Sequence, residues 1–196
     1  VVFVHNYNVS PAEHIIPAAD VSEQISMAGK EASGTSNMKF MMNGALTLGT
    51  LDGANVEILE AVGDDNAYIF GATEDELPGL RESYDPVWHY ENVPGLKRVL
   101  DAFTDGTLDD NGSGWFADLR RSLLEPSYEP ADVYYVLGDF ASYRETKDAM
   151  AAGYADTRAW QRKAWVNITR SGRFSSDRTI SDYAREVWKI DPEPIA

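Results

Sequence analysis

The sequence predicts an α/β fold with a parallel sheet, followed by a helical C-terminal end. In the first third of the chain, short apolar runs typical of buried strands alternate with segments typical of helices. From residue 142 onward, the chain has the periodicity of helices. Because 43% of the 196 residues are apolar, the chain can bury a core, and we expect one domain or slightly more.

The elements expected in the first 70 residues alternate in order. Residues 1–4 form a continuous apolar run, which predicts a strand covered on both faces and a chain that is part of a longer protein. A helix follows, with Ser10 as its N-cap, Pro11 at its first position and Glu13 completing a capping box. Further strands are expected over 21–25, 46–48 and 68–70, a loop over 31–37, a turn at 52–53, and helices over 38–45 and 54–61.

The rest of the chain is expected to be mainly helical. Prolines and acidic turns interrupt the pattern over residues 73–130. The final helix is expected to have one apolar stripe, with Ser175 or Ser176 as its N-cap. We divide the chain, taken as one domain over 1–196, into an α/β part over 1–140 and C-terminal helices over 141–190. Helices are expected over 94–103, 115–124, 142–152, 157–169 and 176–188, and one more strand over 134–137.

Composition excludes several classes of function. With 17 basic and 32 acidic side chains, the net charge of -15 argues against binding to nucleic acid or to an anionic membrane surface. The chain has no cysteine, so it can form neither a disulfide nor a cysteine metal site, which is compatible with the cytoplasm. The three histidines, His5, His14 and His89, lie at no metal-ligand spacing, and we predict no metal site.

Residues 31–39 carry the clearest chemical signal. Small residues from Ser33 to Asn37 precede a helix, and free N–H groups at a helix start bind phosphate, while Gly34 lets the backbone approach a ligand. Lys39 follows among apolar neighbours, which lower the pKa of an amine and make it a nucleophile toward an aldehyde. A phosphate cradle beside such a lysine is what pyridoxal 5′-phosphate requires. A tight turn beside a solvent-exposed lysine is the alternative that these residues leave open.

A longer stretch resembles a known family. Residues 31–47 and 49–57 are similar to the cofactor-attachment region of the glycogen, starch and maltodextrin phosphorylases. The resemblance extends upstream through 6–13 and 16–26 and downstream through 171–180 and 183–186, and is weakest over 73–130. It implies that Lys39 is the catalytic residue that carries pyridoxal 5′-phosphate covalently. It implies further contacts to the cofactor from Thr35, Ser36, Tyr7, Asn8 and Val9, and contacts to glucose hydroxyls from Glu31, Ser33 and Gly34.

The resemblance also implies an architecture and an activity. The fold would be the Rossmann-like C-terminal domain of a two-domain glycosyltransferase-B architecture. The enzyme would be an α-1,4-glucan phosphorylase, a cytoplasmic homodimer that uses inorganic phosphate to release the terminal glucose of glycogen, starch or maltodextrin as α-D-glucose 1-phosphate, with retention. A nucleotide-sugar transferase of the same fold would not need Lys39 in this context.

A second hypothesis concerns the 196 residues by themselves. In the family, the cofactor phosphate lies against the substrate phosphate and exchanges a proton with it. Two phosphates in contact need basic residues nearby, and the family supplies these from a region upstream of this segment. The isolated chain would therefore be an inactive module that binds pyridoxal 5′-phosphate.

Overall fold

The computed structural model describes residues 1–191 and 193, and its central element is a three-stranded parallel sheet. The strands β1 Val21–Gln24, β2 Leu46–Gly49 and β3 Tyr68–Ile69 lie in the order β1-β2-β3. All four residues of β2 are buried: a strand pairs with it on each edge, and the helices α2 and α9 contact it. The predicted α/β fold with a parallel sheet is confirmed, and these three strands lie at the positions predicted for them.

Helices connect and cover these strands. In chain order they are α1 Val9–Ala18, α2 Ser36–Met42, α3 Asn55–Val62, α4 Leu77–Ser83, α5 Pro86–Asn92, α6 Leu96–Asp101, α7 Trp115–Leu124, α8 Val136–Tyr154, α9 Thr157–Arg170 and α10 Ser176–Asp182. Short 3₁₀ turns are η1 Asp64–Asn66 and η2 Ser171–Phe174, and α10 continues directly into the π-helix η3 Tyr183–Trp188. Among the described residues, no helix is both long and apolar enough to cross a membrane.

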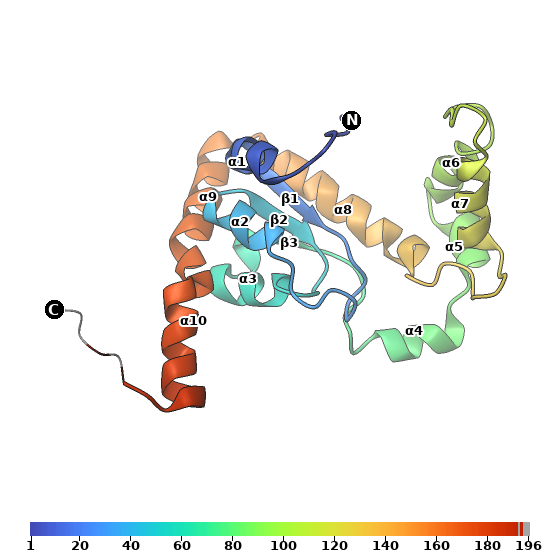
Figure 1. Cartoon of the computed structure of the whole chain (residues 1–196). Helices are drawn as coiled ribbons and strands as arrows, with labels where there is room; N and C mark the ends of the chain where they lie inside the picture. Colours follow the sequence, from blue (N-terminus) through green and yellow to red (C-terminus); the bar gives the residue numbers. More distant parts are fainter. Residues whose placement is uncertain (192, 194–196) are drawn as a thin grey trace.

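The helices form two groups joined by α8 (Figure 1). Near the sheet, α2 packs against β1 and β2, α8 against β3, and α9 against α2 and α3. At the far end of α8, the helices α5, α6 and α7 form a separate cluster (Figure 1). Each group has its own core: Met41, Ile58, Val62 and Ala67 beside the sheet, and Leu96, Leu100, Leu124 and Leu137 in the distal cluster.

The strand predicted for residues 1–4 is wrong. These residues form no regular element and pair with no described strand, and their exposure runs from 40% at Val4 to 134% at Val1. An apolar run becomes a strand only beside a partner, and β1 pairs with β2 alone among the described residues.

The predicted cap of the first helix is also wrong. The side chain of Asn8, not that of Ser10, accepts the first free N–H group, from Ser10 at 3.1 Å. The helix thus begins at Val9, and the expected capping box between Ser10 and Glu13 is not formed. Asparagine is as favourable at the N-cap position as serine, so Asn8 can take the place predicted for Ser10.

The strand predicted at 134–137 is the third correction, because α8 begins at Val136. The carboxylate of Asp132 accepts the N–H groups of Val136 at 2.9 Å and Leu137 at 2.8 Å, and also the hydroxyl of Tyr84. Asp132 is only 3% exposed, so these bonds fix the helix start inside the protein. Burial, followed by the hydrogen bond to Asp132, raises the pKa of Tyr84.

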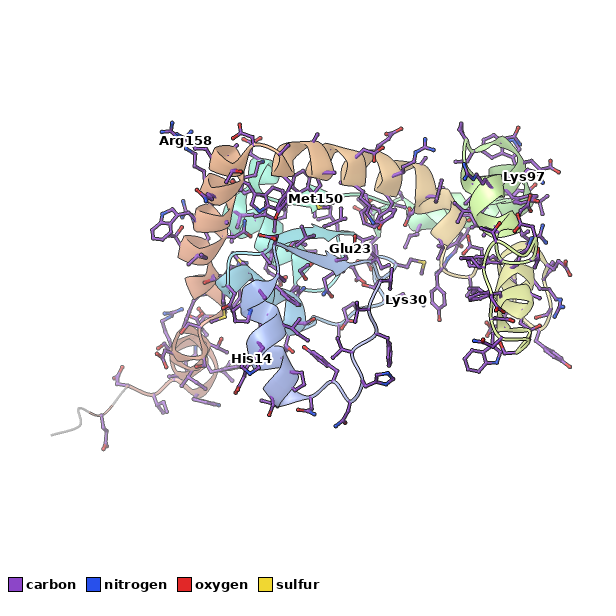
Figure 2. The ribbon with its side chains drawn as sticks, turned by 90° about the horizontal axis from the view of Figure 1, so that it is seen from above. His14, Glu23, Lys30, Lys97, Met150 and Arg158 are labelled. Atoms are coloured by element: carbon purple, nitrogen blue, oxygen red, sulfur yellow. The ribbon has the colours of Figure 1, made fainter. Side chains whose placement is uncertain are left out.

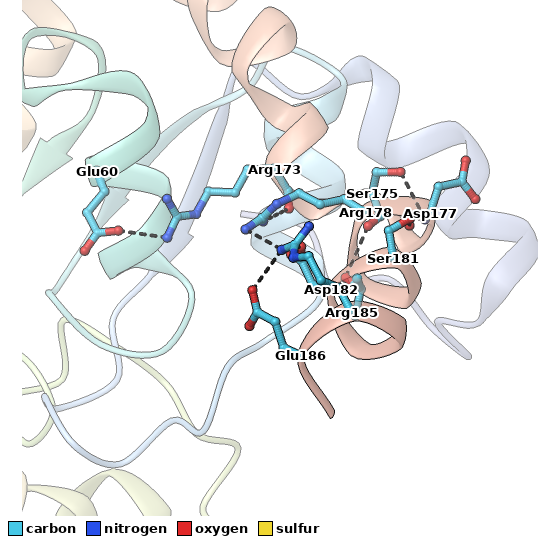
Figure 3. A network of polar contacts seen from close by, with 10 residues as sticks. Glu60, Arg173, Ser175, Asp177, Arg178, Ser181, Asp182, Arg185 and Glu186 are labelled. Atoms are coloured by element: carbon cyan, nitrogen blue, oxygen red, sulfur yellow. Dashed lines mark hydrogen bonds and ion pairs between the residues drawn. The ribbon is translucent and has the colours of Figure 1, made fainter. Parts of the chain in front are cut away.

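The C-terminal helices are confirmed, with Ser175 capping α10 through the N–H of Asp177. Figure 3 shows how this end is tied to the sheet-bearing part: Arg173 donates to Glu60 of α3 at 2.9 Å. Within the C-terminal helices, Arg185 donates to Asp182 at 2.6 Å. Exposed ion pairs of this kind contribute little stability, and the elements that α10 contacts are η2 and η3.

Candidate functional site

A surface groove of about 500 Å³ lies between the start of α1 and the start of α2. Its volume is within the range usual for small-molecule sites. The groove joins two segments that lie almost thirty residues apart in sequence. Figure 2 shows α1, marked by His14, and the loop after β1, marked by Lys30. Its lining residues are Tyr7, Asn8, Val9, Ala12, Glu13, Ile16, Pro17, Thr35, Ser36, Lys39 and Asn43.

All six residues predicted to bind the cofactor line this one groove. Tyr7, Asn8 and Val9 come from the chain entering α1, and Thr35, Ser36 and Lys39 come from α2 and its N-cap position. The groove thus brings one primary amine together with two hydroxyl groups and apolar walls from Ile16 and Pro17. This donor set fits an aldehyde-bearing phosphate ester such as pyridoxal 5′-phosphate.

Lys39 does not have the buried surroundings that its apolar neighbours in sequence predicted. Met41 is fully buried and faces the core, but Lys39 lies on the exposed side of the same helix. Neighbours in sequence point to different faces of a helix, which explains the difference. The amine is accessible from solvent and from the groove.

The two hydroxyl groups lie at the start of α2. Thr35 occupies the N-cap position, yet its side chain makes no capping hydrogen bond. The hydroxyl of Ser36 accepts only a long hydrogen bond from Gln24 of β1, at 3.4 Å. Both hydroxyls therefore remain available to a ligand in the groove.

The three residues predicted to contact glucose lie outside the groove lining, on the loop that leads to α2. Glu31 and Ser33 are exposed, and Gly34 adopts a φ of +81°, which favours glycine. The structure thus separates the site into a groove for one ligand and an exposed loop beside it.

A segment that the sequence identified only as a turn holds this loop. Asp52, 5% exposed, accepts the N–H of Gly29 and the N–H of Glu31, both at 2.9 Å. The N–H of Ala54 donates to the carbonyl of Ser33 at 2.7 Å. The sequence pattern did not identify Asp52, because its partners are 21 and 23 residues away.

A buried pair of amide side chains completes the support. Asn37, at the start of α2, donates to Asn55 at 3.0 Å, and Asn55 donates to the carbonyl of Thr50 at 3.0 Å. Asn37 and Asn55 are 2% and 1% exposed, so water cannot reach their amide groups. The two side chains therefore supply each other's hydrogen-bond partner inside the protein. It fixes α2, and with it Lys39, against the segment after β2.

A comparison with protein families defines the class of protein. Residues 1–190 match the family model described as carbohydrate phosphorylase. The chain therefore belongs to the carbohydrate phosphorylase family.

Individual relatives agree with this assignment. The chain is 47% identical over 196 residues to the glycogen phosphorylase of Synechocystis sp., covering 100% of the chain and 22% of that protein. It is 49% identical over 193 residues to the glycogen phosphorylase of Haemophilus influenzae, covering 98% and 23%. It is 45% identical over 193 residues to the muscle glycogen phosphorylase of Bos taurus, covering 98% and 22%. The chain spans less than a quarter of the length of these relatives.

Proposed function

We propose that the chain is the cofactor-holding part of an α-1,4-glucan phosphorylase. The observation that carries this proposal is the groove in which Lys39 lies with Thr35, Ser36 and the residues entering α1. Family membership and the similarity to glycogen phosphorylases support it. The architecture we propose is the Rossmann-like C-terminal domain of a glycosyltransferase-B protein, with the sheet and loops over 1–140 and the C-terminal helices over 141–190.

Each groove residue has a role in this proposal. Lys39 holds pyridoxal 5′-phosphate through a covalent bond at its Nζ atom, which the exposure of the amine permits. Thr35 and Ser36 donate their hydroxyl protons to its phosphate oxygens, since neither hydroxyl is committed elsewhere as a donor to a described residue. Tyr7, Asn8 and Val9 cover the open side of the groove. When bound, the cofactor supplies a phosphate that can hold and release a proton beside a substrate phosphate.

The proposed reaction is phosphorolysis of the terminal α-1,4-linked glucose of glycogen, starch or maltodextrin by inorganic phosphate. The product is α-D-glucose 1-phosphate, with retention of configuration. Glu31, Ser33 and Gly34 orient the terminal glucose from the loop next to the groove. Such orientation raises the rate of the reaction, because the entropy cost of aligning the reactants is met on binding and not in the chemical step.

For the 196 residues alone, we propose a cofactor-binding module without activity. Lys39 is the one cationic side chain among the lining residues, and Glu13 places a carboxylate in the same lining. Two phosphates in contact need more positive charge than this lining provides. We place the full-length enzyme in the cytoplasm as a homodimer, in line with its membership of the family.

The test compares two lysines. The chain is incubated with pyridoxal 5′-phosphate, and bound cofactor is measured by near-ultraviolet absorbance after gel filtration. We expect one equivalent in the wild type and in Lys30→Ala, because Lys30 lies outside the groove lining. We expect none in Lys39→Ala, and full-length protein with this substitution should release no glucose 1-phosphate. Equal cofactor in both variants would refute the proposed site.

A further inference from the structure

The loop over residues 29–34, which follows β1, is held against the segment over 50–55, which follows β2. The contacts begin at Thr50, whose hydroxyl donates to the carbonyl of Ser26 at 2.6 Å. They continue through Asp52 to the N–H groups of Gly29 and Glu31 and through Ala54 to Ser33. The neighbouring segment therefore supplies most of the hydrogen bonds that shape the loop, beside one local bond from the N–H of Lys30 to the carbonyl of Met27 at 3.1 Å.

Asp52 makes the contact that this loop depends on most. In a turn that includes a residue with positive φ, the backbone N–H groups can converge and form a concave site for an anion. The loop contains such a residue, because Gly29 has a φ of +76°. The Asp52 carboxylate fills that site, with Oδ1 accepting from Gly29 and Oδ2 accepting from Glu31, both at 2.9 Å. Hydrogen bonds to a charged acceptor are the stronger kind, and burial to 5% exposure protects them from water.

Close packing leaves the loop no alternative position near Asp52. Gly53 has a φ of +52°, and a Cβ atom there would lie 2.4 Å from the carbonyl oxygen of Ser33 and 3.1 Å from the Cγ atom of Glu31. The loop backbone thus lies directly on the backbone of Gly53. A carboxylate on one side and this contact on the other fix Glu31 in place.

We propose that Asp52 is a positioning residue that places Glu31, and the loop that follows it, for the terminal glucose of the substrate. The inference rests on the proposed function, because it takes the loop as the glucose-binding element. Asp52 itself is 5% exposed, and both of its oxygens are occupied by N–H groups of the loop, so it acts through the loop. It is separate from the cofactor groove, whose lining does not include it.

The variant Asp52→Asn tests this role with little change of shape. Each carboxylate oxygen of Asp52 accepts a hydrogen bond from a different N–H group. In asparagine, an NH₂ group replaces one of these oxygens, so one of the two loop N–H groups would face another donor and lose its hydrogen bond. Asp85→Asn is the matched control: Asp85 also accepts two N–H groups, from Val87 and Trp88, but both through Oδ1. An asparagine at 85 can keep both bonds through its single oxygen.

The experiment uses the full-length phosphorylase that contains this chain, loaded with pyridoxal 5′-phosphate. For Asp52→Asn we expect unchanged cofactor content, a rise of about 10-fold in the KM for maltodextrin, and a fall of about 10- to 100-fold in kcat/KM. Hydrogen exchange at Gly29 and Glu31 should become at least about 10-fold faster, while exchange in β1 stays slow. Asp85→Asn should match the wild type in all of these measurements.

Three results would overturn the inference. The first is wild-type kinetics in Asp52→Asn despite faster exchange at Gly29 and Glu31. The second is loss of bound cofactor in parallel with activity, since Asp52 would then support the groove rather than the loop. The third is an unfolded Asp52→Asn protein, with rapid exchange throughout β1. A wild-type protein without bound cofactor would instead refute the proposed function, and the inference with it.

Discussion

Replacing Gly53 by alanine should displace the loop over residues 29–34 without touching the cofactor groove. The added Cβ atom would lie 2.4 Å from the carbonyl oxygen of Ser33, whereas unstrained contacts between non-bonded heavy atoms lie at about 3.5 Å. The loop must therefore retreat by roughly 1 Å, well beyond thermal adjustment in a close-packed protein. That movement also breaks the 2.7 Å hydrogen bond from Ala54 to Ser33.

The structure allows the cost to be divided into two parts. An alanine at positive φ costs about 1 kcal/mol of stability by itself. The lost hydrogen bond and the forced movement add about 1–2 kcal/mol. Gly114→Ala is the matched control, because Gly114 is in the left-handed region, with a φ of +79° and a ψ of 0°, and nothing lies within 4 Å of its Cβ position. It should cost only the first part, about 1 kcal/mol.

The two variants are compared by thermal unfolding and by phosphorolysis in the full-length enzyme. For a chain of this size, Gly114→Ala should lower Tm by about 2–4 °C and Gly53→Ala by about 5–10 °C. Only Gly53→Ala should also lower kcat/KM for maltodextrin, by about 100-fold, since a misplacement of about 1 Å has that effect on a bound substrate. Equal Tm values, or full activity in Gly53→Ala, would refute the reasoning.

Two further predictions concern the start of α8. Asp132→Ala removes the acceptor for Val136, Leu137 and Tyr84 and should lower the free energy of unfolding by about 3 kcal/mol, measured in urea. The second follows from the raised pKa of Tyr84, caused first by burial and then by Asp132. Because the folded chain holds this proton more tightly than the unfolded chain, the stabilisation is full below the ordinary pKa of 10.0 and is lost above it. Above pH 10.0, the free energy of unfolding should fall by up to about 1.4 kcal/mol per pH unit. Tyr84→Phe should remove the contribution of Tyr84 to this pH dependence.

Part of the fold could be predicted because the relevant pattern was local. The apolar run of β2, Leu46–Gly49, identified a central strand, and the structure buries all four residues. The same pattern failed at residues 1–4, because no described strand lies beside them. At Val136 the pattern failed for another reason: the cap, Asp132, precedes the helix by four residues, and Tyr135 between them has a φ of +53°. A capping interaction across such a turn is not visible as sequence periodicity.

The candidate site was predictable only in its ligand-facing residues. The resemblance assigned Lys39, Thr35 and Ser36, and the structure places them in one groove. The supporting residues Asp52 and Asn55 were not identified, because hydrogen bonding to groups about twenty residues away leaves no periodic signal. A buried carboxylate or amide becomes informative only when its partners are known.

The central claim is tested most directly by finding the lysine that carries the cofactor. The protein with bound pyridoxal 5′-phosphate is reduced with borohydride, digested with trypsin and analysed by mass spectrometry. Trypsin does not cut at a modified lysine, so a label on Lys39 should give a pyridoxyl peptide over residues 31–81, the next cleavage site being Arg81. A label on Lys30 would instead give a peptide that contains Lys30 and ends at Lys39. The account predicts the first peptide, and a label at Lys30, elsewhere or nowhere would contradict it.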